Sequence, residues 1–187
     1  MRKQINTVVS LALVVAILCF SLPAQDFPEV YTAMLIASEA VAGQGAGRIN
    51  IRIMAYTSDA EKAALKTAFQ KSQDDGMALL RGMDKGFINL EGQPGRKIYA
   101  VFSRNLQKGH EVIIVSEHVA SGLEKWNNVD VKQHPLAMVD LRFNDSGDPV
   151  KGEVFPAVKL NITADGYPDV QTDDSNKVIM TELARKR

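Results

Sequence analysis

The feature that most constrains the fold is the β-patterned stretch that fills the chain from residue 87 to its end. Short runs of apolar and β-branched residues recur there, separated by turn-forming residues around Gly109 and in segment 144–149. No run between these strands is long enough for the crossover helix that joins parallel neighbours. We therefore expect antiparallel strands, as in an open sheet or a barrel.

Alternation of side chains places the individual strands. Ile49, Ile51 and Ile53 alternate with polar neighbours and predict a half-buried strand over 49–56. Further strands are expected at 87–90, 97–104, 111–117, 136–143, 150–155, 158–163 and 178–183.

Two helices are expected directly after the strand at 49–56. Ser58 and Glu61 have the spacing of a capping box, which predicts the start of the first helix. The second helix is expected over 75–83. Another helix is expected nearer the N-terminus, over 26–42, because apolar residues recur there at helical spacing.

These patterns predict an α+β protein: an antiparallel sheet or partly closed β-barrel of about eight strands, with a two-helix insertion after the first strand. Residues 1–25 are expected to be a signal peptide, because basic residues precede an apolar run at 8–22 that ends in Pro23. That run is shorter than the roughly 20 residues that span a bilayer; an uncleaved anchor is the alternative. Residues 26–47 would form a helix and a glycine-rich joint, and 48–187 a single domain.

Composition excludes several function classes. Cys19 is the only cysteine and lies in the expected signal peptide, so a mature domain would have neither a disulfide nor a thiol nucleophile. The chain has 22 basic and 22 acidic side chains, which gives no reason to expect nucleic acid as a partner. The basic residues 185–187 are expected to be a solvated tail. Contact with a membrane is expected only through the signal peptide, and the mature protein is expected to be periplasmic or secreted.

No pattern predicts a cofactor or a metal site. His110, His118 and His134 lack the spacing of zinc ligands. The acidic segments 145–148 and 165–169 do not match a calcium-binding loop, and their composition is that of tight turns. The chain also lacks the Gly-x-Ser-x-Gly pattern of a nucleophile elbow.

Three residues are candidates for binding a ligand or partner. Asp140 and Arg142 share the polar face of the strand at 136–143. They would form a ligand site if that face lines a barrel interior, and a solvent-facing ion pair if it does not. Trp126 lies in a polar stretch and would be either an exposed anchor for a partner or a lid on the core. A barrel interior would hold a small apolar ligand or be filled by its own side chains.

The sequence GRINIRI at 47–53 and the sequence YTSDAE at 56–61 resemble a group of small secreted proteins from environmental bacteria. The resemblance continues loosely through 79–80 and 86–88. It implies export and a bacterial envelope, and it implies no activity and no site residue.

The leading functional hypothesis is therefore a non-enzymatic exported domain that binds a small apolar ligand or an envelope component. One alternative is a barrel-type enzyme, cyclase- or hydrolase-like, that uses Asp140, Arg142 or a histidine. Another is a structural envelope protein that presents Trp126 and a sheet edge to a partner.

Overall fold

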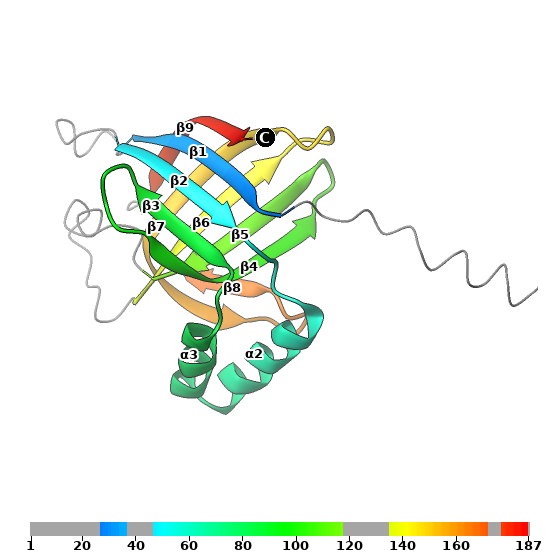
Figure 1. Cartoon of the computed structure of the whole chain (residues 1–187). Coiled ribbons are helices and arrows are strands. Elements are labelled where there is room, and N and C mark those ends of the chain that lie inside the picture. The colour runs from blue at the N-terminus through cyan, green and yellow to red at the C-terminus, as the bar shows by residue number, and fades with distance from the viewer. Residues whose placement is uncertain (1–26, 37–46, 118–134, 172–176, 187) are drawn as a thin grey trace, which may run out of the picture.

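The computed structural model describes residues 27–36, 47–117, 135–171 and 177–186. Its centre is a closed antiparallel β-barrel in which neighbouring strands follow the order β6-β5-β4-β3-β2-β1-β9-β7, and pairing of β7 with β6 closes the ring (Figure 1). The barrel strands are β1 (Glu29–Ile36), β2 (Gly47–Ile53), β3 (Gly86–Leu90), β4 (Arg96–Asn105), β5 (His110–Ser116), β6 (Leu136–Phe143), β7 (Pro149–Ile162) and β9 (Val178–Lys186). The remaining strand, β8 (Pro168–Gln171), pairs with the end of β7. The predicted fold class is confirmed, with the barrel closed.

The helix expected over 26–42 is wrong where the structure describes it, because this part of the chain is strand β1. β1 pairs with β2 on one side and with β9 on the other. Tyr31, Ala33 and Leu35 are buried and alternate with half-buried neighbours. Both faces of this segment are apolar, so its residues fit a helical spacing as well as a period of two. Pairing with β2 and β9 along its two edges stabilises the strand. The helices consequently follow the second strand, not the first.

The helices α2 (Asp59–Lys71) and α3 (Gln73–Gly82) lie between β2 and β3. The predicted capping box is present: the Ser58 hydroxyl accepts a hydrogen bond from the Glu61 backbone N–H, and the Glu61 carboxylate accepts one from the Ser58 N–H at 2.8 Å. The ammonium of Lys85 donates to the same carboxylate at 2.7 Å. That hydrogen bond is the main reason why the pKa of Glu61 is lowered. The start of α2 is thereby fixed to the segment that leads into β3.

Buried apolar side chains form two clusters. The first fills the barrel interior and contains residues from all eight barrel strands. Within it, the rings of Tyr31 on β1 and Phe143 on β6 meet edge to face, with centroids 5.6 Å apart. The second cluster lies on the outer wall, where Leu65 and Leu80 of the helices join outward-facing residues of β4, β5, β6 and β7. The barrel wall is thus covered on both sides in this region, as the two aliphatic faces of its strands indicate.

The two strands expected at 150–155 and 158–163 are one strand, β7. Pro156 and Ala157 together lie opposite Ala137 in the register between β6 and β7, so they form a bulge. A bulge accommodates a proline inside a strand because it interrupts the ladder of hydrogen bonds at that point. β7 therefore continues from the barrel into the outer layer, where it pairs with β8.

No helix within the described ranges is both long and apolar enough to cross a lipid bilayer. The expected signal peptide at 1–25 and most of the expected glycine-rich joint lie outside the described residues.

Candidate functional site

The best-defined polar network lies at one end of the barrel, where β1 begins and β9 ends; we call this end the barrel mouth. Its centre is Glu29, which is only 4% exposed. The hydroxyls of Tyr31 and Tyr56 donate to the same carboxylate oxygen at 2.7 and 3.2 Å. The guanidinium of Arg185 lies 3.5 Å from the other oxygen. A buried negative charge is thus held by two hydroxyl donors and one cation, as a charge in an apolar surrounding requires.

Aromatic rings surround this network. Phe27, just before β1, contacts the ring of Tyr56 with centroids 5.8 Å apart. Phe143 contacts Tyr31 and stacks on the imidazole of His110, with the centroids of the latter pair 4.4 Å apart and the planes nearly parallel. The barrel mouth therefore combines flat apolar surfaces with a carboxylate and a guanidinium.

Both tyrosines of the network have a raised pKa. Burial is the largest cause for each of them, and the hydrogen bond to Glu29 and the negative charge of Glu29 add to it. The phenols therefore remain protonated through the neutral range. They can act as hydrogen-bond donors there, and they are poorly suited to serve as general bases.

The raised tyrosine pKa values predict a loss of stability at alkaline pH. Above about pH 10 the unfolded chain releases its tyrosine protons while the folded protein retains them, so stability falls as the pH rises. We expect the double variant Tyr31→Phe, Tyr56→Phe to show a shallower fall, by up to ~1.4 kcal/mol per pH unit for each tyrosine removed. Urea unfolding between pH 8 and pH 11 measures this slope. The double variant should keep part of the slope, because burial also raises the pKa values of Tyr99 and Tyr167. An unchanged slope in the double variant would contradict the assignment.

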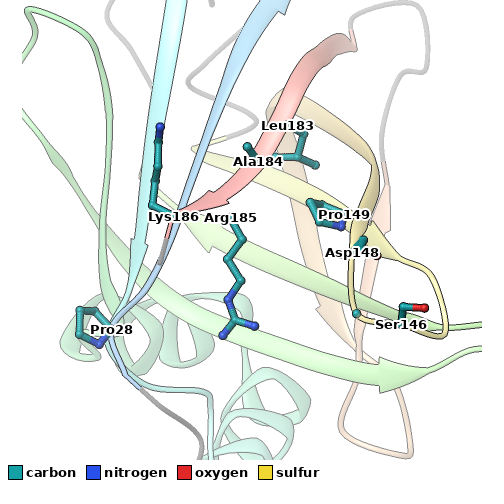
Figure 2. Close-up of a pocket in the computed structure, with 9 residues that line it drawn as sticks. Pro28, Ser146, Asp148, Pro149, Leu183, Ala184, Arg185 and Lys186 are labelled. Atoms are coloured by element: carbon teal, nitrogen blue, oxygen red, sulfur yellow. The ribbon is translucent and has the colours of Figure 1, made fainter.

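A groove opens beside this network. It has a volume of about 820 Å³. It is lined by Pro28, by the β6–β7 turn with the first residue of β7, and by the last residues of β9, namely Ser146, Gly147, Asp148, Pro149, Leu183, Ala184, Arg185 and Lys186. In Figure 2, Leu183 lies opposite Pro149, while the side chains of Arg185 and Lys186 leave β9 in opposite directions.

The groove exists because β9 and β7 separate toward the barrel mouth. Within the described chain, their pairing is limited to three residue pairs, from Val154 with Val178 to Gly152 with Met180. Beyond this point β9 continues along β1 only. The register with β1 shifts at Glu182, whose φ of 52° lies in the left-handed region. Such a bulge bends its strand, and bulges are frequent at the rims of barrels.

The predicted ligand residues Asp140 and Arg142 lie elsewhere, on the outer wall. Their strand neighbours Val139 and Leu141 belong to the interior cluster. Arg142 Nε lies 3.2 Å from Asp140 Oδ2, and Arg142 Nη2 lies 3.5 Å from Glu111 Oε1. The structure thus brings these two predicted residues together as an ion pair on the outside of the barrel.

The pair belongs to a row of charges that crosses four strands; we call it the charge ladder. It consists of Arg104, Glu111, Asp140, Arg142, Lys151 and Glu153. Its three carboxylates are buried, while its cations are about half exposed. Among the described residues, Asp140 Oδ1 is a buried oxygen without a hydrogen-bond partner. Glu111 Oε2 lies 2.5 Å from Arg104 Nε and is therefore ion-paired.

Two carboxylates of the charge ladder have opposite pKa shifts. Burial, followed by the charge of Glu111, raises the pKa of Asp140 despite the opposing effect of Arg142. Burial also acts to raise the pKa of Glu153, but hydrogen bonds from Lys151 and Lys177 outweigh it, and the net shift is downward. The surroundings thus disfavour the ionised form of Asp140 and favour that of Glu153.

This difference predicts opposite effects for two matched substitutions. An acid whose pKa is raised by folding contributes stability only at low pH, and this contribution is lost as the pH rises through the folded pKa. Asp140→Asn should therefore raise the midpoint of thermal unfolding at pH 7 and give little change at pH 3. Glu153→Gln should lower the midpoint at pH 7, because its ion pairs are lost. Thermal unfolding of both variants at the two pH values measures this, and effects of the same sign would refute the charge assignment.

Of the other sequence candidates, one lies at the barrel mouth in the described structure, namely His110. Trp126, His118 and His134 lie outside the described residues. His110 stacks on Phe143 at the barrel mouth. No group of three or more His, Cys, Asp or Glu side chains suited to a metal ion is found among the residues that the structure describes.

Sequence reasoning missed the network of Glu29, Tyr31, Tyr56 and Arg185. The tail expected at 185–187 is strand β9 for its first two residues, Arg185 and Lys186, and both side chains are exposed as expected. The signal that was available is the alternation of Glu29, Tyr31 and Ala33, which places the carboxylate and the phenol on one face of a strand.

Comparisons of the chain with protein-family models, with curated proteins and with solved structures found no match. The fold defines the class: an eight-stranded antiparallel β-barrel with a helical layer on part of its outer wall.

Proposed function

We propose that the protein is an exported, non-enzymatic binding domain whose ligand occupies the groove at the barrel mouth. The observation that carries the proposal is the groove itself, which lies where β9 separates from β7. Its volume of about 820 Å³ is within the range of ligand sites, roughly 300–1,000 Å³, and barrel mouths are common places for them. Export is proposed from the basic and apolar pattern of residues 1–25.

The lining of the groove indicates the chemistry of the ligand. Leu183 and Pro149 offer an apolar surface, and Leu183 also packs against the interior cluster. Lys186 offers a positive charge on the same strand, and Arg185, which pairs with Glu29, is about half exposed. A ligand with an apolar part and an acidic group would use both features. The barrel interior is a less suitable place, because a continuous cluster of its own side chains occupies it.

Two observations favour binding over catalysis. Asp140 and Arg142, which an enzymatic site would need inside a pocket, lie on the outer wall as members of the charge ladder. The phenols of Tyr31 and Tyr56 are held in their protonated form by burial and by Glu29. The barrel mouth is therefore suited to hold an acidic ligand and offers it no tyrosine base near neutral pH.

Two acidic probes of different shape test the proposal. The first is anilinonaphthalene sulfonate, a compact aromatic anion, and the second is a fluorescein-labelled six-residue peptide that alternates valine and glutamate. We expect at least one of them to bind the folded protein with a stoichiometry of one. Ala184→Trp, which fills the groove from an exposed position on β9, should weaken that binding at least tenfold.

The matched control is Ala60→Trp, an equal change at an exposed position on α2. It should leave the affinity unchanged, and circular dichroism should show both variants folded. The proposal fails if neither probe binds, or if both tryptophan variants weaken binding equally.

A further inference from the structure

We propose that the natural occupant of the groove is an extended acidic peptide segment of a partner protein, which adds as a strand to the free edge of β9. This inference rests on the proposed function, because it assigns a ligand class to the same groove. It concerns main-chain recognition, in which backbone hydrogen bonds provide affinity and alternate side chains provide selectivity.

The first support is the free edge of β9. One edge of this strand pairs with β1 up to the pair of Lys186 with Val30. On the other edge, no partner for Thr181–Lys186 is present within the described ranges, since pairing with β7 ends at Met180. Backbone donors and acceptors along this edge are available to an incoming strand, as at any sheet edge. At ~3.3 Å per residue, six strand residues extend over roughly 20 Å.

The second support is the way in which the edge is kept apart from β7. A Cβ atom on Gly152 would lie 2.6 Å from the Met180 sulfur and 3.2 Å from Leu183, so the two strands approach closely at this point. The bulge at Glu182 then turns the rest of β9 away. Pro149 begins the facing part of β7 and has no backbone N–H to offer across the gap. β7 therefore provides no hydrogen-bond partners for the backbone of β9 beyond Met180.

The third support is the side-chain surroundings, which identify the partner's chemistry. Lys186 places a cation on the free-edge strand beside Arg185, which is about half exposed while it pairs with Glu29, and Asp148 is the one acid among the lining residues. A strand that alternates apolar and acidic residues would place its apolar side chains on the face of Leu183 and its carboxylates on the opposite face, where Lys186 lies. Charge complementarity therefore selects an acidic segment.

Backbone-modified peptides provide the test. The parent is the valine–glutamate peptide, and its derivative carries N-methyl groups on two alternate residues, which removes two donors and leaves the side chains and charge in place. We expect the derivative to bind about tenfold or more weakly, as expected for two lost hydrogen bonds. Hydrogen exchange should show that the parent protects amides within residues 181–186 and the derivative does not.

A charge exchange tests the side-chain part of the inference. Lys186→Glu, at an exposed position, should lower the affinity for the valine–glutamate peptide at least fivefold and raise the affinity for a valine–lysine peptide. Equal affinity for the parent and the N-methylated peptide would overturn strand addition. Preference for the valine–lysine peptide by the unmodified protein would overturn the acidic assignment.

The outcomes separate this inference from the proposed function. If anilinonaphthalene sulfonate binds, if Ala184→Trp weakens its binding, and if no peptide binds, then the groove is a ligand site and the peptide assignment is wrong. If residues 181–186 become protected with rising protein concentration and no added peptide, the occupant is a second copy of this chain, which also overturns the inference. If neither probe binds, the proposed function itself fails.

Discussion

The variant Glu29→Ala is expected to unfold with a free energy roughly 3 kcal/mol lower than that of the unmodified protein. The substitution removes the acceptor for two tyrosine hydroxyls at 2.7 and 3.2 Å and the counter-ion of Arg185. Buried hydroxyls without an acceptor lose their hydrogen bonds without regaining those of water. The guanidinium is about half exposed, so its contribution is the smaller part.

Urea unfolding at pH 7 measures the loss, with Glu29→Gln as the matched control. Glu29→Gln removes the charge but keeps a carbonyl oxygen as an acceptor for the tyrosine hydroxyls. It should therefore lose only about half as much stability as Glu29→Ala. The triple variant Glu29→Ala, Tyr31→Phe, Tyr56→Phe should be more stable than Glu29→Ala alone, because no donor is left unpaired. A loss below about 1 kcal/mol in Glu29→Ala would show that water replaces the carboxylate at the barrel mouth.

Gly86→Ala is expected to destabilise the protein by about 3 kcal/mol or more. Gly86 begins β3 and has a φ of 132°, which an L side chain rarely adopts. A Cβ atom there would also lie 2.0 Å from the carbonyl oxygen of Arg52 on the neighbouring strand. Because that obstacle is backbone, it cannot rotate away, and β2 and β3 would have to separate where they pair.

Two other glycines separate the two causes of this effect. Gly92 has a φ of 79° but open space around a Cβ atom, so Gly92→Ala should cost only about 1 kcal/mol. Gly82, at the end of α3, has open space and no positive φ, so Gly82→Ala should stabilise the protein by roughly 0.5–1 kcal/mol. Thermal and urea unfolding of the three variants should give this order. A cost for Gly86→Ala no larger than that for Gly92→Ala would show that the contact with Arg52 is relieved by small movements.

Much of the architecture could be predicted because local patterns and tertiary pairing agree. The strand over 136–143 was predicted with its observed bounds, since apolar residues occupy one face and Asp140 and Arg142 the other. The start of α2 followed from the Ser58–Glu61 capping box. In both places the pattern depends on neighbouring residues alone, so knowledge of distant parts of the chain was unnecessary.

The errors occur where distant partners decide the structure. Residues 29–36 have two apolar faces, and only pairing with β2 and β9 distinguishes strand from helix. The strand β8, in a segment expected to be a turn, is stabilised by its pairing with β7. The candidate site was missed for the same reason, because Glu29 and Arg185 lie at opposite ends of the described chain and meet only when the barrel closes.

One strand, β7, belongs to both hydrophobic clusters: Val154 lies in the interior cluster, and Val158 and Leu160 lie in the outer one. The helical layer is therefore not a module that could be detached or transplanted by itself. Any opening of the outer layer would pull on a strand that also closes the barrel, and the two cores are expected to melt as a single cooperative unit.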